Sequence, residues 1–411
     1  MVLLSSPRNR LLLRFRLFST TLSPPSISLS SAKSKLRSEF DPDKALAIFS
    51  SISKPSSSSS TPTPISFSYA LDLTVKRLFK SRRFADIETL IESQKTHNPI
   101  ISQEPFLSSL ILSYGRATML DHAIRTFADM DLLGTPRSTS SFNALLAACI
   151  HPQKLDRVAE LFAEFPPKYG ISPDKMSYGI LIKSQCELGS PETSIETLKE
   201  MEEMNVEITT IAYTTIVDAL YRKGKIEAAE EIWDKMHAKG CCLDVGAYNV
   251  KLRHTHHGKP EEVQKLIMKM GASGVKPDII SYNYLLKCYF ANNQTEEAKK
   301  VYKDLWELRC LPNAWTFNIM VHYLCENGEF DTALRVCKAS IKRNKIPDFR
   351  TVRSLLEGLV KNLKMRDAKA LIDMVRKRCP ERFSTEWSKI EMELGLKGAE
   401  KGAAAEVVAA A

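Results

Sequence analysis

Apolar residues recur along most of this chain at the spacing of an α-helix. Residues 210–244 show the pattern clearly, because two groups of apolar positions there follow one another at intervals of three and four residues. Gly224 separates the two groups, and Gly240 closes the second, as expected of glycines that end helices. The pattern predicts a pair of antiparallel helices with the apolar faces Tyr213, Ile216, Val217, Leu220 and Ala229, Ile232, Trp233, Met236.

The same helix pair repeats along the chain with a period close to 35 residues. An aromatic residue opens each unit, and four times an asparagine follows it. A second marker, a Pro-Asp or related dipeptide, ends four residues before the aromatic and keeps the same period. Two markers with one period predict a tandem array. The aromatic–asparagine pairs are Phe142-Asn143, Tyr248-Asn249, Tyr282-Asn283 and Phe317-Asn318.

We therefore expect an all-α fold, an α-solenoid of about nine tandem 35-residue helix-turn-helix repeats over residues 68–383. Residues 39–67 are expected to hold a partial repeat and a serine- and proline-rich linker, and residues 384–411 the end of a helix and a disordered alanine-rich tail. The expected units are 68–103, 104–138, 139–174, 175–209, 210–244, 245–278, 279–313, 314–348 and 349–383.

The amino-terminal segment 1–38 is rich in arginine and serine and has no acidic residue. Arginines interrupt its leucines, so it lacks the continuous apolar run of a secretory signal. This composition is typical of an organellar transit peptide. Arg16-Leu17-Phe18-Ser19 resembles a mitochondrial processing site with cleavage after Phe18. We expect import into the mitochondrial matrix, with the plastid as the alternative.

The charge of the chain favours a polyanionic partner. Lysine and arginine number 58 and aspartate and glutamate 48, which gives a net charge of +10. No apolar run approaches the roughly 20 residues that cross a bilayer, so we expect no membrane contact.

The repeated markers resemble those of the pentatricopeptide repeat family, whose units have this length, an aromatic–asparagine opening and a Pro-Asp close. The uniform unit length is similar to that of the P class of plant organelles. The tetratricopeptide repeat, a protein-binding family of similar period, lacks the paired asparagine and the Pro-Asp. The resemblance implies binding of single-stranded RNA, with one base read per unit by two side chains.

Carried onto this sequence, the resemblance implies base-reading roles for the residue after each opening aromatic and for the last residue of the unit. Asn–Asp pairs favour uracil, Thr–Asp guanine and Asn–Asn a pyrimidine, which gives a target similar to U-N-G-U-Y-U. For any single asparagine the alternative role is helix capping. The expected pairs are Asn143 with Asp174, Thr214 with Asp244, Asn249 with Asp278, Asn283 with Asn313, and Asn318 with Asp348; Ile280 and Trp315 are expected to sandwich bases, and Gly179, Ser108 and Arg353 depart from the pattern.

Basic side chains near the unit junctions are candidates for phosphate contacts, which would make binding sensitive to salt. The alternative for each is a solvated helix face. The candidates are Lys223, Lys251, Arg253, Lys342 and Arg343.

The sequence carries none of the catalytic motifs of a zinc deaminase or a phosphate-binding enzyme. No His-x-Glu is present to join a Cys-x-x-C pair in a zinc deaminase site, and no glycine-rich phosphate loop occurs. His254, His256 and His257 lack a neighbouring cysteine that would complete a zinc site. We expect no enzyme activity, no catalytic residue, no metal, no cofactor and no small-molecule substrate.

The expected function is that of a non-catalytic RNA-binding protein of mitochondrial translation or RNA metabolism. A constituent of the mitochondrial ribosome, in its small subunit, and a transcript-specific stabilisation or processing factor both fit. A protein-interaction scaffold without RNA contact is the third alternative.

Overall fold

The computed structural model describes residues 27–52, 64–97, 101–378 and 384–396. Within these ranges the regular structure is helical, and a single isolated bridge joins Ile27 to Ile52. The all-α repeat fold expected from the sequence is confirmed. The chain divides into two compact units, the first ending at Ile226 and the second beginning at Glu227.

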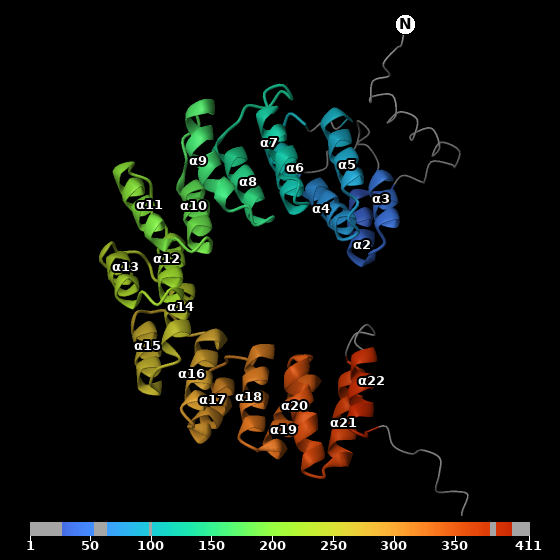
Figure 1. The fold of residues 1–411 in the computed structure, drawn as a ribbon, viewed down its shortest axis with the longest axis vertical. Helices are drawn as coiled ribbons and strands as arrows, with labels where there is room; N and C mark the ends of the chain where they lie inside the picture. Colours follow the sequence, from blue (N-terminus) through green and yellow to red (C-terminus); the bar gives the residue numbers. More distant parts are fainter. Residues whose placement is uncertain (1–26, 53–63, 98–100, 379–383, 397–411) are drawn as a thin grey trace, which may run out of the picture. The chain divides into compact units, whose positions relative to one another are not determined.

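Unit 1 holds the helices that precede this division, coloured blue to green in Figure 1. They are α2 (Leu29–Ser38), α3 (Pro42–Ser50), α4 (Pro64–Lys80), α5 (Phe84–His97), α6 (Glu104–Arg116), α7 (Leu120–Ala128), α8 (Thr139–Ile150), α9 (Asp156–Tyr169), α10 (Lys175–Glu187), α11 (Pro191–Glu203) and α12 (Thr210–Arg222).

Unit 2 holds the remaining helices, coloured yellow-green to red in Figure 1. They are α13 (Ile226–Ala238), α14 (Val245–Thr255), α15 (Pro260–Ala272), α16 (Ile279–Ala291), α17 (Thr295–Glu307), α18 (Ala314–Glu326), α19 (Phe330–Lys342), α20 (Phe349–Lys361), α21 (Met365–Arg376) and α22 (Ser384–Glu393).

Within each unit the helices alternate between two layers. The first helix of each pair contacts the first helices of the neighbouring pairs. In unit 1 these contacts run in the order α4, α6, α8, α10 and α12, and in unit 2 in the order α14, α16, α18 and α20. The second helices pack on this layer; α7 lies against α6 and α8, and α19 against α18 and α20. Each of the helices α8, α10 and α16 packs against two first helices and two second helices. No other described helix packs closely on the remaining face of any of the three.

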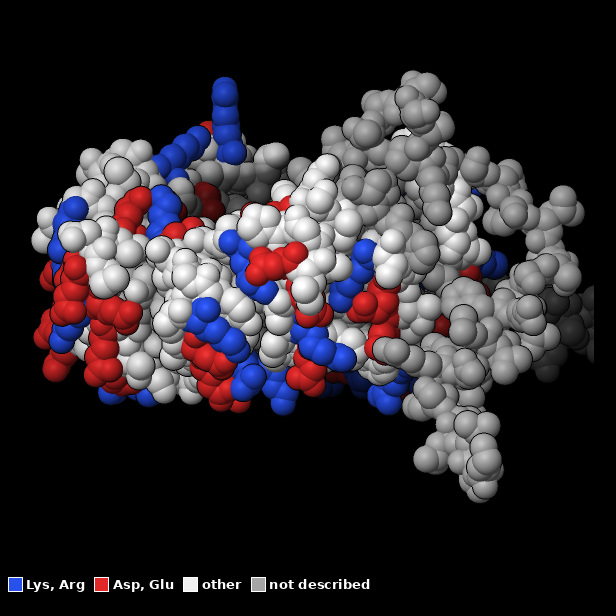
Figure 2. All heavy atoms as spheres, turned by 90° about the horizontal axis from the view of Figure 1, so that it is seen from above, with Lys and Arg blue, Asp and Glu red and all other residues white. Residues whose placement is uncertain are grey.

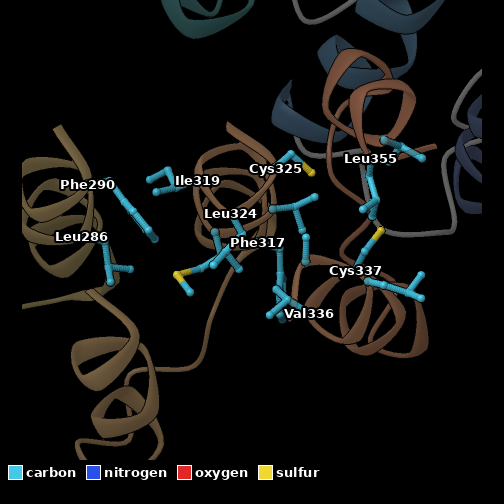
Figure 3. Close-up of a cluster of buried hydrophobic side chains, with 14 of the residues drawn as sticks. Leu286, Phe290, Phe317, Ile319, Leu324, Cys325, Val336, Cys337 and Leu355 are labelled. Carbon is cyan, nitrogen blue, oxygen red and sulfur yellow. The ribbon is translucent and has the colours of Figure 1, made fainter. Parts of the chain in front are cut away.

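Small and apolar residues at fixed places in each pair fill the space between the layers. The opening aromatics Phe142 and Phe317 are fully buried, as their inward-facing position requires. In unit 2 the core continues from one first helix to the next and down to the second helices (Figure 3). Its side chains include Leu286 and Phe290 of α16, Phe317, Ile319, Leu324 and Cys325 of α18, Val336 and Cys337 of α19, and Leu355 of α20.

The helical packing begins ahead of the expected array and inside the range 1–38 assigned to targeting. Ala32 and Leu36 of α2 are fully buried, and α2 packs on α3 and α4. The Arg77 Nε of α4 also donates to the Glu39 carbonyl oxygen at 2.9 Å. Helix α2 thus belongs to the fold because its apolar face covers α4. Targeting would then use residues before 29, and the expected cleavage after Phe18 lies outside the described residues.

Other expected boundaries also differ from the helix ends. Helix α4 begins at Pro64, within the range 39–67 that was expected to hold the partial repeat and linker. The serine-rich residues 53–63 and the tail from 397 lie outside the described residues. Helix α22 occupies the start of the expected carboxy-terminal segment.

One glycine allows a particularly close approach of two first helices. Gly115 of α6 faces Ala148 of α8, and a Cβ atom at Gly115 would lie 2.5 Å from both the Cα and the Cβ of Ala148. Such a distance forces the helices apart. Gly179 of α10 is a matched contrast, since a Cβ atom there would meet nothing within 4 Å.

We predict opposite effects for alanine at these two glycines. Gly115→Ala should lower the free energy of unfolding by about 1–3 kcal/mol through overpacking. Gly179→Ala should raise it by up to about 1 kcal/mol through helix propensity. Urea unfolding followed by circular dichroism measures both changes, and a Gly115→Ala protein as stable as the parent would contradict the close packing of α6 on α8.

Candidate RNA-binding interface

The face of the first helices that carries no second helix presents one stripe of residues per helix. On α16 the stripe is Ile280, Asn283, Lys287 and Ala291, spaced by three and four residues along one side of the helix. We call the equivalent set on each first helix its free stripe. The free stripe of α14 is Gly246, Asn249 and Arg253, and that of α18 is Trp315, Asn318, His322 and Glu326.

The last residue of each repeat caps the first helix of the next one. Asp174 caps α10, and its side chain accepts hydrogen bonds from the amides of Met176 and Ser177. Asp278 does the same for α16. The other capping side chains are those of Asp244 on α14, Asn313 on α18 and Asp348 on α20. Capping, the alternative role considered for the asparagines, therefore belongs to the partner positions, while Asn143 and its equivalents lie inside their helices.

Four of these capping residues also meet the asparagine of the repeat before them. The Nδ2 of Asn143 donates to the Oδ1 of Asp174 at 3.0 Å, and that of Asn249 to the Oδ1 of Asp278 at 3.1 Å. The structure thus brings together residues that the sequence separates by almost a whole repeat. The two further contacts are from Asn283 Nδ2 to Asn313 Oδ1 at 3.4 Å and from the Asp348 amide to Asn318 Oδ1 at 3.0 Å. Thr214 and Asp244, the remaining expected pair, lie in unit 1 and unit 2 respectively.

Two serines that the sequence analysis missed fix the orientation of these amides. The Ser177 hydroxyl donates to the Oδ1 of Asn143 at 2.6 Å, and the Ser281 hydroxyl to the Oδ1 of Asn249 at 2.7 Å. Both serines form capping boxes with the aspartate that begins their helix. The sequence pattern that could have revealed these two residues is a serine directly before the opening aromatic and three residues after the capping aspartate.

The network favours the ionised form of two capping aspartates, Asp174 and Asp348. Burial acts to raise the pKa of Asp174, but the hydrogen bonds that it accepts from Ser177, Asn143 and Met176 outweigh burial, and the net pKa is lowered. The pKa of Asp348 is lowered in the same way, against burial, by bonds from Thr351 and Asn318. These carboxylates therefore act as acceptors, while each asparagine amide keeps a second N–H to donate.

Asn283 differs from the other asparagines. It is fully buried, and its Oδ1 has no hydrogen-bond partner in the described structure. In the next helix Thr316 takes the place of the serine, and its hydroxyl bonds to the Oδ1 of Asn313. The exposure that base reading requires is thus absent at this position in the present conformation.

The expected sandwiching residues both lie on free stripes. Ile280 is 38% exposed. Trp315 is half-buried and meets the ring of Tyr284 edge-on, with the ring centres 5.2 Å apart. Tyr284 in turn lies 5.3 Å from the ring of His256. Burial, and then the neighbouring charges of His257 and Lys287, lower the pKa of His256 to about 4, so this packed histidine is neutral near pH 7.

Of the five expected phosphate contacts, only Arg253 lies on a free stripe. Lys251 follows Asn249 by two residues, so it points to the other side of α14, where it pairs with Glu230 and lies over the ring of Trp233. Lys223 pairs with Glu192 of α11. Arg343 lies over Trp306 at 4.7 Å, and Lys342 ends the second helix α19.

Charge on the visible outer surface is mixed. On the face shown in Figure 2, blue and red side chains lie interleaved, so that face offers no continuous basic surface. Within the described ranges, no three His, Cys, Asp or Glu side chains gather in a way that could hold a metal ion. None of the helices there combines the length and the apolar character that a membrane span requires.

Two family models match parts of the chain. A model described as the PPR repeat family matches residues 208–256 and 277–326. A second model, described as the PPR repeat, matches residues 176–206 and 315–344.

Relatives match over nearly the whole chain. A mitochondrial pentatricopeptide repeat-containing protein of Arabidopsis thaliana is 50% identical over 97% of this chain and 95% of its own length. The small ribosomal subunit protein mL103 (rPPR7) of the same plant is 50% identical over 92% of this chain and 91% of its own length. Among solved structures, the pentatricopeptide repeat protein PPR10 from maize is similar over 93% of this chain and 62% of its own, with a TM-score of 0.45 and 14% identity. With half of its residues identical to relatives that it matches almost from end to end, this chain belongs to the pentatricopeptide repeat family.

Proposed function

We propose that this protein binds single-stranded RNA through the free stripes of its first helices, without catalysis, as a mitochondrial protein of organellar translation. One observation carries the proposal. In two places a partly exposed asparagine inside one first helix is hydrogen-bonded to the aspartate that caps the next, so a repeated donor–acceptor pair stands on the open face of the layer.

The chemistry of these pairs matches the edge of a base. Uracil offers a carbonyl oxygen beside an N–H group. The second N–H of an Asn249-type amide can donate to the carbonyl, and the carboxylate of an Asp278-type cap can accept from the N–H. Cytosine has a ring nitrogen acceptor instead of that N–H, so it leaves the carboxylate unsatisfied. Two side chains per repeat then distinguish one base.

A place in the small ribosomal subunit is the first candidate for the cellular role. The support is the full-length relative that bears a small-subunit name and is 50% identical to this chain. A transcript-specific factor is the second candidate, because a protein that merely touches ribosomal RNA backbone has no need of oriented Asn–Asp pairs.

The base-reading role predicts a large loss of RNA affinity when the amides are removed. Combined substitution of Asn143, Asn249 and Asn318 by alanine deletes three donors, each worth about 1 kcal/mol. Binding of a short oligouridine, measured by fluorescence anisotropy, should weaken by a factor of about 100.

A control asparagine away from the free stripes tests specificity. Asn327 is exposed after α18 and donates to the Thr295 hydroxyl at 2.8 Å. Asn327→Ala should bind RNA as the parent does. Unchanged affinity in the triple variant would instead favour a protein-interaction scaffold.

The two cellular roles predict different sedimentation. A small-subunit protein should co-migrate with that subunit in a gradient of mitochondrial extract and remain there after limited nuclease treatment. Release into the light fractions after nuclease would contradict the ribosomal role and support the transcript-specific factor.

A further inference from the structure

The free stripes of unit 2 carry a second row of polar side chains beside the base-reading row. One helical turn beyond Asn249, Asn283 and Asn318 stand Arg253, Lys287 and His322, each four residues farther along its helix. Since α14, α16 and α18 contact one another in that order, the three side chains form a line across adjacent helices. We call Arg253, Lys287 and His322 the stripe-cation row.

The members of the row remain accessible. Arg253 and His322 are exposed, and Lys287 is partly exposed. The Arg253 Nε points toward α16, where it meets the Tyr284 hydroxyl at 3.4 Å. The Lys287 ammonium lies near enough to His256 to disfavour a charge on that ring. His322 has one acidic neighbour on its own helix, Glu326, at 3.5 Å.

The row has defined ends. On α20 the equivalent position is Glu357, which forms an ion pair with Arg353 at 2.7 Å. On α12, in unit 1, it is Asp218, paired with Arg222 at 3.1 Å. Acidic residues at this position repel phosphate, so the uninterrupted run of basic side chains covers three consecutive repeats; on α10 of unit 1 the equivalent residue is Lys183, which pairs with Glu187 at 3.8 Å.

An RNA strand read at one base per repeat also presents one phosphate per repeat. If the bases contact the asparagine row, the phosphates of the same nucleotides lie to one side of that row. One helical turn, which separates the stripe-cation row from the asparagines, is a suitable distance between base and phosphate contacts. The other expected phosphate contacts are directed elsewhere: Lys251 toward Glu230 and Arg343 toward Trp306.

We propose that the stripe-cation row is the phosphate-binding track of this protein, and that it holds the RNA backbone along α14, α16 and α18. The proposal rests on the RNA-binding function proposed above. It assigns most of the salt dependence of binding to unit 2, through Arg253 and Lys287, with His322 as a hydrogen-bond donor to phosphate oxygen.

Salt titration separates this role from base reading. The affinity of the full chain for single-stranded oligouridine is measured over a range of KCl concentrations, for the parent protein and for the double variant R253Q/K287Q. Each phosphate contact on a single strand contributes about 0.7 to the slope of log affinity against log salt, so the double variant should reduce the slope by about 1.4. Its preference for oligouridine over oligocytidine should stay unchanged.

Two exposed lysines on second helices provide a charge-matched control, Lys265 on α15 and Lys300 on α17. The K265Q/K300Q variant should keep the parental slope, and circular dichroism verifies that both variants are folded. An unchanged slope in R253Q/K287Q, or an equal reduction in the control, would overturn the track while the RNA-binding function stands. If the parent binds no RNA, the function and the track both fail.

Discussion

The interface depends on one hydrogen-bonded junction, in which a single capping side chain serves two neighbouring repeats. Asp278 shows it most fully. Its Oδ1 accepts from the backbone amides that begin α16, and it also accepts from the side-chain amide of Asn249 on α14. The start of one helix and the direction of a side chain on the preceding one are therefore fixed by the same atom.

This junction links stability and recognition. A helix cap contributes about 1 kcal/mol, and the cap is present whether or not RNA is bound. In the proposed base reading the asparagine amide would already be held in place when a base arrives, so less side-chain entropy would be lost on binding. The lowered pKa of Asp174 has the same origin, because the hydrogen bonds that orient the pair also stabilise the negative charge.

The sequence predicted the features that repeat with the period and missed those set by a single neighbour. Helix pairs, buried aromatics such as Phe142, and the pairing of Asn143 with Asp174 all follow from positions that recur in register. The burial of Asn283 does not, because its opening marker Tyr282-Asn283 matches those of the other repeats. The ion pair of Lys251 with Glu230 could not be predicted either, because the prediction needs to know which side of α14 faces α13. The place of α2 in the fold was hidden because an amphipathic, acid-free helix also fits a targeting segment.

The most direct measurement is the base preference of the junction at Asp278. Asparagine caps helices as well as aspartate does, so Asp278→Asn preserves the fold and removes only the charge and one acceptor. With RNAs that differ at a single nucleotide, the parent should favour uracil over cytosine at one position, and the variant should lose or reverse that preference with an unchanged melting temperature. The same uracil preference in both proteins would contradict a base-reading role for the capping residue.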